Sequence, residues 1–413
     1  MTNYRCERLW TPDGVREDVV IGTSGTPYRL SGLVFPGFAN AHSHAFHRAL
    51  RGRTHDDGGT FWTWRRSMYA LAERLDPDSY RELATAVYAE MALAGISCVG
   101  EFHYLHHAPG GAGYADPNAM AEALRQAAAD AGIRLTLLDT CYLSGGIDSP
   151  LSLVQQRFSD GTAEAWASRV AELKPDATMR VGAAIHSVRA VPREELAIVA
   201  VSDPRRPLHV HLSEQPAEND ACRAAYDRTP TELLHEAGVL SPRTTAVHAT
   251  HLSTRDISLL GSTRTSVCVC PTTEADLADG IGPARELADA GCPLSLGSDQ
   301  HAVVDPFVEA RALEHGERLR TGQRGRFTPR ELGLALTRHE SLGWPEKHLD
   351  LVAVRTDSVR TAGSTPEQIL LAATAADVHT VVVDGKIVAR DGHHEWLGDV
   401  GRLLDTAIGR LWA

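Results

Sequence analysis

Short apolar runs and longer amphipathic segments alternate regularly through the middle of the chain. Most of the runs contain almost only apolar and small residues, which is typical of parallel strands buried on both faces. The runs cover residues 33–44, 96–104, 133–143, 179–187, 207–214, 244–250, 264–271 and 293–299. Eight βα units in succession predict an α/β fold, a (β/α)8 TIM barrel, whose active site lies at the carboxyl ends of the strands.

The segments between the runs have helical features. Residues 77–95, for example, begin with Pro77, carry apolar residues at helical spacing and end at Gly95. An open doubly wound sheet is the competing architecture, and it normally has a GxGxxG or GxxxxGK loop after an early strand. Neither motif follows any of the runs, which favours the barrel.

The two ends of the chain differ from its middle. Residues 1–32 hold short strand-like runs and turns, and residues 346–413 hold two more such runs with an Asp-Gly turn. We expect these ends to form one small β-sandwich domain, with a last helix at 399–412. The barrel domain is then expected over residues 33–345.

The net charge of the chain limits the classes of molecule that it can bind. The 413 residues carry a formal net charge of −12, and the basic residues form no dense cluster, which argues against nucleic acid or an anionic membrane surface. The beginning, MTNYRCERLW, has no apolar signal segment, and no stretch approaches the length of a membrane span. We therefore expect a cytoplasmic protein that acts on a small molecule.

Seven cysteines are scattered along the chain without a CxxC pair, which is typical of reduced cytosolic thiols. Cys268 and Cys270 could form a metal-binding pair. They lie in a β-branched run, however, where buried thiols are common, and this favours the structural interpretation.

The chain contains 20 histidines, roughly twice the ordinary usage. A single histidine is more often a core or surface residue than a ligand, but several of these stand at carboxyl ends of predicted strands. His42 and His44 are two residues apart and therefore face the same way. The side chains expected to converge at the barrel mouth are those of His42, His44, His211, His248 and Asp299.

Imidazole nitrogens with one carboxylate suit a divalent metal, with zinc favoured and iron or manganese as alternatives. Glu214 follows His211 by three residues, just beyond the end of its strand. A carboxylate there can act as an acid or base beside the metal.

The motifs that carry these residues resemble those of the amidohydrolase superfamily. PGFANAHSH at 36–44 is similar to its opening HxH signature, and the β-sandwich built from both chain ends is similar to its second domain. HxxE at 211–214 resembles its deaminase branch, which implies one divalent metal held by His42, His44, His211 and Asp299. Binuclear members carry a bridging lysine or glutamate after the third or fourth strand, whereas the fourth run here ends in Ile185-His186-Ser187.

Several strings narrow the resemblance to the formimidoylglutamate deiminases: AHSHAFHRAL, FWTWR, EFHYLHH, HSVRAV, HLSEQ, VHATH, TTEADLADGI and GSDQH, between about 33 and 319. The resemblance implies hydrolysis of the C=N group of N-formimidoyl-L-glutamate to N-formyl-L-glutamate and ammonia. It implies that Asp299 accepts a proton from the metal-activated water, that His248 orients the hydroxide and that Glu214 protonates the leaving nitrogen. It also implies a homodimer.

The resemblance further implies which residues bind the substrate. Arg65 and Arg189 correspond to positions that clamp its two carboxylates, and Tyr104 and His186 to positions that contact it. His47 stands where many members have a substrate-contacting glutamine, so the fine specificity is left open. Trp62 and Trp64 are expected to serve the packing of the helix that carries Arg65 and not to bind a ligand.

Two alternatives remain. Another deaminase of the superfamily would act on a guanidine, a cytosine-like ring or a triazine, but two arginines favour an anionic substrate over a neutral ring. A non-catalytic barrel is the second alternative. Such proteins usually lose ligand histidines, and every expected ligand position is filled here.

Overall fold

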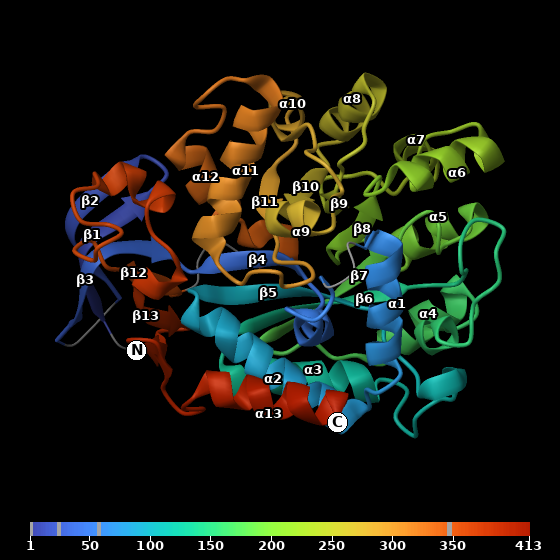
Figure 1. The fold of residues 1–413 in the computed structure, drawn as a ribbon, viewed down its shortest axis with the longest axis horizontal. Helices are drawn as coiled ribbons and strands as arrows, with labels where there is room; N and C mark the ends of the chain where they lie inside the picture. Colours follow the sequence, from blue (N-terminus) through green and yellow to red (C-terminus); the bar gives the residue numbers. More distant parts are fainter. Residues whose placement is uncertain (1–2, 23–25, 56–58, 345–348) are drawn as a thin grey trace.

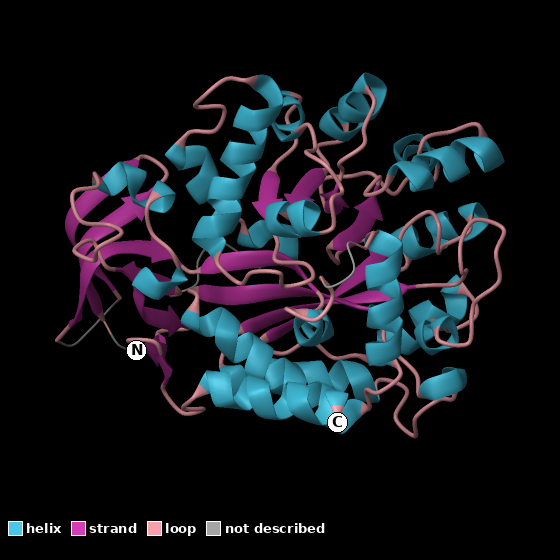
Figure 2. Ribbon diagram, viewed as in Figure 1, coloured by secondary structure: helices cyan, strands magenta, loops and turns pink. Residues whose placement is uncertain are grey.

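The computed structural model describes residues 3–22, 26–55, 59–344 and 349–413. Its centre is an eight-stranded parallel sheet surrounded by helices, as Figures 1 and 2 show, so the predicted (β/α)8 barrel is confirmed. The barrel strands, in the order of their pairing, are β4 (Phe38–Ser43), β5 (Ile96–His103), β6 (Arg134–Cys141), β7 (Met179–Ile185), β8 (Leu208–Leu212), β9 (Thr244–His248), β10 (Ser266–Val269) and β11 (Leu294–Leu296).

The barrel closes between its first and last strands at their carboxyl ends. Ser43 forms a parallel bridge with Asp299. The amide of Asp299 donates to the carbonyl of His42 at 3.0 Å, and the amide of His44 donates to the carbonyl of Asp299 at 3.1 Å. Three of the predicted ligand residues are therefore held by the backbone hydrogen bonds that close the barrel.

The helices lie around the barrel strands (Figure 1). The α-helices are α1 (Phe61–Ala72), α2 (Pro77–Leu93), α3 (Ala119–Ala131), α4 (Ala163–Glu172), α5 (Arg193–Val201), α6 (Pro216–Tyr226), α7 (Pro230–Glu236), α8 (Thr254–Ser262), α9 (Pro271–Asp276), α10 (Ala284–Asp289), α11 (Pro306–Thr321), α12 (Pro329–Leu336) and α13 (Val400–Trp412). Short 3₁₀ helices are η1 (Ala45–Leu50), η2 (Pro109–Gly111), η3 (Gln155–Phe158), η4 (His339–Leu342), η5 (Pro366–Leu371) and η6 (Ala375–Asp377).

The helix predicted over residues 77–95 is confirmed as α2. Asp76 caps it by accepting a hydrogen bond from the amide of Ser79 at 2.8 Å, and Pro77 occupies the first turn. Gly95 has φ +94°, a conformation that favours glycine, and turns the chain directly into β5.

Strands from both chain ends combine in a second sheet, here called the terminal sheet, at the side of the barrel where β4 begins (Figure 1). β1 and β3 pair in parallel, and the other neighbouring strands pair antiparallel. The expected domain boundary at 345 and 346 lies outside the described residues. The strands, in the order of their pairing, are β15 (His393–His394), β14 (Lys386–Arg390), β13 (Val378–Val383), β12 (Leu351–Val354), β3 (Tyr28–Pro36), β1 (Tyr4–Thr11) and β2 (Gly14–Ile21).

One predicted strand is wrong in its extent. The run at 33–44 is two strands in different sheets, because β3 pairs with β12 up to Pro36 and β4 pairs with β5 from Phe38 onward. Gly37 separates them, and its amide donates to the carbonyl of Asp350 at 2.9 Å. A Cβ at Gly37 would lie 2.1 Å from Oγ of Ser97, so only glycine permits this close passage between the sheets.

The last helix, α13, packs on the helical layer of the barrel beside α2 (Figure 1). Asp399 caps it by accepting from the amide of Arg402 at 3.0 Å. At its other end, Nε1 of Trp412 donates to the carbonyl of Ala49 at 3.0 Å, and Arg74 donates to the carbonyl of Leu411 at 2.6 Å. The helix predicted at 399–412 is thus confirmed.

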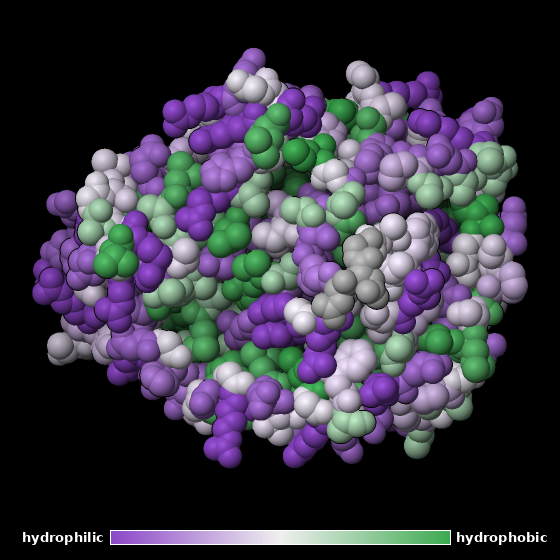
Figure 3. Space-filling view, in the orientation of Figure 1, coloured by the Kyte–Doolittle hydropathy of each residue, from purple (hydrophilic) through white to green (hydrophobic). Residues whose placement is uncertain are grey.

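No described helix is long and apolar enough to cross a membrane. On the face shown in Figure 3, hydrophobic residues occur in separate groups among hydrophilic ones. The seven cysteines are buried free thiols, and Cys268 and Cys270 pack with Ala41 and Val247 in the barrel.

A buried ion pair joins the barrel to the terminal sheet. Arg134, the first residue of β6, donates to the two carboxylate oxygens of Asp350 at 3.0 and 3.1 Å. We expect Arg134→Met to lower the free energy of unfolding by about 3–5 kcal/mol, because it leaves a buried carboxylate uncompensated. Urea unfolding measures the loss. Arg5→Met, at the exposed pair of Arg5 with Asp18, is the control, and an equal shift in both variants would contradict the prediction.

Candidate metal centre and active site

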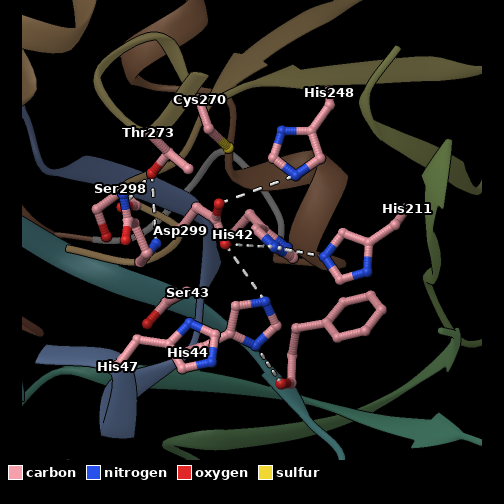
Figure 4. Close-up of polar contacts among 12 residues, drawn as sticks. His42, Ser43, His44, His47, His211, His248, Cys270, Thr273, Ser298 and Asp299 are labelled. Atoms are coloured by element: carbon pink, nitrogen blue, oxygen red, sulfur yellow. Dashed lines mark hydrogen bonds and ion pairs between the residues drawn. The ribbon is translucent and has the colours of Figure 1, made fainter. Parts of the chain in front are cut away.

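Four of the predicted residues meet at the carboxyl ends of the barrel strands. His42 and His44 come from β4, His211 from β8, and Asp299 follows β11. Each offers one ligand atom, the four atoms lie within 4.8 Å of one another, and all four side chains are buried. Figure 4 shows the three imidazoles and the carboxylate pointing toward a common centre.

Backbone carbonyls orient two of these rings. Nδ1 of His44 donates to the carbonyl of Phe102, and Nδ1 of His211 donates to that of His186, each at 2.9 Å. Their Nε2 atoms are therefore unprotonated in the neutral ring and turned toward the centre. Burial lowers the pKa of His44 to about 4 and that of His42 to about 3, which keeps both rings neutral near pH 7.

Asp299 is the acidic member of the group. Its Oδ1 lies 3.3 Å from Nε2 of both His42 and His44. Burial acts to raise the pKa of this carboxyl, but the hydrogen bond with His42 and the neighbouring imidazoles hold it well below its ordinary value. Three imidazole nitrogens and one ionised carboxylate oxygen are a donor set that fits a divalent cation such as zinc.

His248, at the end of β9, stands beside this group and between three carboxylates. Its Nε2 lies 3.7 Å from Oε1 of Glu214 and 3.8 Å from Oδ2 of Asp299, and its Nδ1 lies 3.4 Å from Oε1 of Glu274. Burial opposes protonation, but these three acids raise the pKa of His248 well above its ordinary value. His248 and Asp299 have φ +68° and +42°, so the backbone is strained at both positions.

The five residues predicted to bind the substrate line one pocket together with three of the convergent residues, and its space of about 570 Å³ is continuous with the solvent. They are His47, Arg65, Tyr104, His186 and Arg189, and Glu214 lines the same pocket. Burial raises the pKa of Glu214, while His248 and Arg189 lower it. The structure thus brings every predicted site residue to one place.

Two cationic groups reach this pocket from different elements. Arg65 comes from α1, where its guanidinium lies 5.2 Å from the ring centre of Trp62 and 5.1 Å from that of Tyr69. Trp62 therefore stacks on Arg65, whereas Trp64 lines the pocket. Arg189 follows β7, and its Nη2 lies 3.8 Å from Oε2 of Glu214.

His47 forms a hydrogen bond with Tyr104. Nε2 of His47 lies 2.9 Å from the hydroxyl of Tyr104, and the ring of His47 packs 4.5 Å from that of His44 and 5.0 Å from that of Trp64. Burial lowers the pKa of His47 well below its ordinary value, so the ring is neutral near pH 7. It is available as a neutral hydrogen-bonding group, not as a cation.

Comparison with known sequences identifies the family. Residues 33–388 match the sequence model of the Amidohydrolase family. The chain belongs to the amidohydrolases. It is therefore a hydrolytic enzyme, and its relatives place it among the deaminases of the superfamily.

Three similar proteins show the range of activities around this amidohydrolase. Formimidoylglutamate deiminase of Pseudomonas aeruginosa is 36% identical over 412 residues, which cover 93% of this chain and 90% of that protein. 8-Oxoguanine deaminase of the same organism is 30% identical, over 90% of this chain and 85% of that protein. An adenosine deaminase from Xanthomonas campestris, solved with bound zinc, has the same fold, with a TM-score of 0.85, 21% identity and coverage of 100% and 98%.

Two acidic residues of this amidohydrolase were missed as site residues. Glu274 faces His248 from α9 and also accepts from the amide of Cys270 at 2.8 Å. Glu218 lies 3.7 Å from Nε of Arg189. Nothing in the sequence indicated this contact, because Glu214 lies in the loop after β8 and Glu218 lies in the first turn of α6. For Glu274, nothing in the sequence indicated contact with a strand 26 residues earlier.

Ser298 and Gln300 flank Asp299 in the chain. The amide of Ser298 donates to Oδ1 of Asn40 at 2.9 Å, and its hydroxyl accepts from Nδ2 of the same residue at 2.7 Å. The side chain of Gln300 donates to Asp276 at 2.7 Å. Both residues therefore anchor the segment that carries Asp299.

Among the described residues, His103, His106 and Asp139 form a second cluster of possible ligand atoms in this amidohydrolase. Asp139 already accepts hydrogen bonds from Nε1 of Trp166 at 2.9 Å and from two nitrogens of Arg169 at 2.9 and 3.0 Å. The guanidinium neutralises the only carboxylate of this cluster, so we interpret it as a structural ion pair.

Proposed function

We propose that this amidohydrolase hydrolyses the terminal C=N bond of N-formimidoyl-L-glutamate to give N-formyl-L-glutamate and ammonia. The observation that carries the proposal is one pocket that combines the convergent ligand atoms, Glu214 and two guanidinium groups. The substrate has one amidine and two carboxylates, which matches this set of groups. The relative that is 36% identical adds independent support.

We propose zinc as the cation, held by His42, His44, His211 and Asp299, with iron or manganese as alternatives. When bound, it would supply Lewis acidity that lowers the pKa of water at the site. The Xanthomonas protein with bound zinc supports this choice.

The chain's own acid and base groups move the protons. The oxygen of one water bonds to the amidine carbon, the bond from that carbon to the terminal nitrogen breaks, and both protons of the water leave with this nitrogen as ammonia. Glu214 carries protons from the water to the nitrogen, since it is buried next to His248 and lines the pocket. His248 donates a hydrogen bond from Nε2 and orients the attacking oxygen. Asp299 accepts one of the two water protons on its second oxygen and then releases it to the leaving nitrogen, so both protons end on ammonia.

The substrate's two negative charges need local compensation, because the net charge of the protein is −12. Arg65 from α1 and Arg189 from the loop after β7 supply this positive charge. Each guanidinium can bind a carboxylate through two donors. Tyr104, His186 and His47 provide neutral hydrogen-bonding groups between them.

The direct test gives the zinc-loaded enzyme N-formimidoyl-L-glutamate and measures ammonia and N-formyl-L-glutamate together. We expect the two products in equal amounts. Formation of glutamate and formamide would show that a different bond is cut and would overturn the proposal.

A planar-ring deaminase is the second candidate, and the pocket wall gives a reason to test it. Six Phe, Trp and Tyr side chains line the pocket, and such rings can stack on a heterocycle. They are Phe61, Trp64, Tyr69, Tyr104, Tyr142 and Phe158. Turnover of 8-oxoguanine in preference to N-formimidoyl-L-glutamate would establish this alternative, which the 30% identical relative suggests.

The substitution Arg189→Met tests whether the positive charge of Arg189 binds a substrate carboxylate. We expect kcat/KM for N-formimidoyl-L-glutamate to fall about 10- to 150-fold, because a hydrogen bond to a charged group contributes about 1.5–3 kcal/mol. Steady-state kinetics and metal analysis measure the effect. Arg193→Met, at an exposed pair with Glu236, is the control. An unchanged kcat/KM in Arg189→Met would remove Arg189 from the binding site.

We also propose an oligomeric state, a location in the cell and a domain division for this protein, from the family resemblance and the composition. They are a homodimer, a location in the cytoplasm and a division into a terminal β-domain and a barrel domain. The division was expected as 1–32 with 346–413 against 33–345, but because β3 continues in the terminal sheet to Pro36, we place its first boundary at Gly37. Sedimentation analysis of the purified chain tests the oligomeric state.

A further inference from the structure

Glu218 is a buried carboxylate in the first turn of α6, and the reaction described above does not use it. Its side chain is 0% exposed. Among the described residues, no side-chain donor lies in hydrogen-bonding geometry with either of its oxygens, and only the backbone amides of Ser213 and Glu214 act on it as donors besides Arg189. Its closest ion-pair partner is Arg189, whose Nε lies 3.7 Å from Oε2 and is itself buried without a hydrogen bond.

Arg189 lies between two acids, Glu214 in the loop before α6 and Glu218 in the first turn of that helix. Nη2 faces Glu214 at 3.8 Å, and Nε faces Glu218 at 3.7 Å. The pocket wall includes Arg189 and Glu214, so Glu218 contacts the guanidinium from outside the pocket. The two acids therefore share one cation, and only one of them belongs to the proposed proton path.

Burying a carboxylate with no compensating charge is strongly unfavourable, so this arrangement depends on the guanidinium. Burial raises the pKa of Glu218 to about 7, and Arg189 acts against this rise. The dependence is mutual, because Arg189 is only partly exposed and its flexible side chain has several possible orientations. Without Glu218, the nearest remaining carboxylate for Arg189 is that of Glu214.

We infer that Glu218 is a positioning residue for Arg189 that sets the preference of the pocket for anionic substrates. Its carboxylate holds Nε of the guanidinium at the pocket wall and prevents Arg189 from closing onto Glu214. Donors of Arg189 thus stay available to a substrate carboxylate, and Glu214 stays available for proton transfer. This inference rests on the proposed function, because it assigns the substrate carboxylate to Arg189.

The kinetic test uses Glu218→Gln, which keeps the size of the side chain and removes its charge. We expect KM for N-formimidoyl-L-glutamate to rise about tenfold, with kcat changed less than about threefold and the metal content unchanged. Asp220→Asn, at an exposed position of the same helix, is the matched control. An unchanged KM, or a fall in kcat alone, would overturn the inference.

A double-mutant cycle separates positioning from a general structural effect. If Glu218 acts through Arg189, adding Glu218→Gln to Arg189→Met leaves KM as it is in Arg189→Met alone. A merely structural role would raise KM by the same factor in both backgrounds, and that result contradicts the inference.

Binding of glutarate, a dicarboxylate without an amidine, gives a readout that needs no turnover. Calorimetry should show weaker binding of glutarate to zinc-loaded Glu218→Gln than to the wild type, by about the same tenfold factor. Failure of the proposed function appears as a wild type that binds glutarate but does not hydrolyse N-formimidoyl-L-glutamate. Equal glutarate binding by wild type and variant, or no glutarate binding by the wild type, overturns the role of Glu218.

Discussion

Removal of the divalent cation with a chelator is expected to lower kcat more than about 10⁴-fold, and stoichiometric zinc is expected to restore it. The physical reason is the acidity of water, whose pKa falls from 15.7 to about 7 when a catalytic zinc holds it. The four convergent ligand atoms that would hold the cation belong to buried side chains.

The measurement is the initial rate of ammonia release, with metal content determined on the same samples. Circular dichroism before and after chelation is the control for folding, because the barrel is closed by backbone hydrogen bonds independently of the cation. Full activity in protein shown to be free of metal would contradict both the cation site and the deaminase mechanism.

Glu214→Gln is expected to lower kcat by about 10²–10⁴, with KM changed little and the metal retained. An amide has the size of the carboxyl but cannot take up and release a proton. Glu214 is buried, and its Oε1 lies 3.7 Å from Nε2 of His248. Among the described residues, Asp299 is the only other carboxylate that lines the pocket. Single-turnover and steady-state rates measure the loss.

The variant Glu194→Gln, at an exposed position of α5, is the control for this substitution. Burial raises the pKa of Glu214, so its protonated form persists to higher pH than that of an exposed carboxyl, and acid catalysis is lost as pH rises through that value. The fall of kcat on the alkaline side of its pH profile should therefore be absent in Glu214→Gln. A variant with wild-type kcat would assign the proton path to another residue.

The convergence of the four candidate ligands could be predicted because it depends on local spacing. His42 and His44 are two residues apart on a strand and must face one side, and parallel strands bring His211 and Asp299 to the same end of the barrel. Only two periodicities, that of the strand and that of the βα unit, were needed for this step.

The break at Gly37 could not be predicted from the same periodicity. Residues on both sides of it are apolar and extended, so the run reads as one strand. The assignment of Pro36 to the terminal sheet depends on its pairing with Leu351, more than 300 residues later in the chain. Likewise, α13 was predicted as a helix, but its packing on α2 depends on contacts with residues such as Ala49.

The amino-acid sequence by itself determined the barrel, the helices around it and the ligand-bearing ends of its strands, because each follows from repeats within a short window of chain. Only the tertiary structure decided that Glu274 faces His248 and that Glu218 shares Arg189 with Glu214. These partnerships join elements that are distant along the chain. Burial makes them energetically important, and burial is a property of the folded molecule.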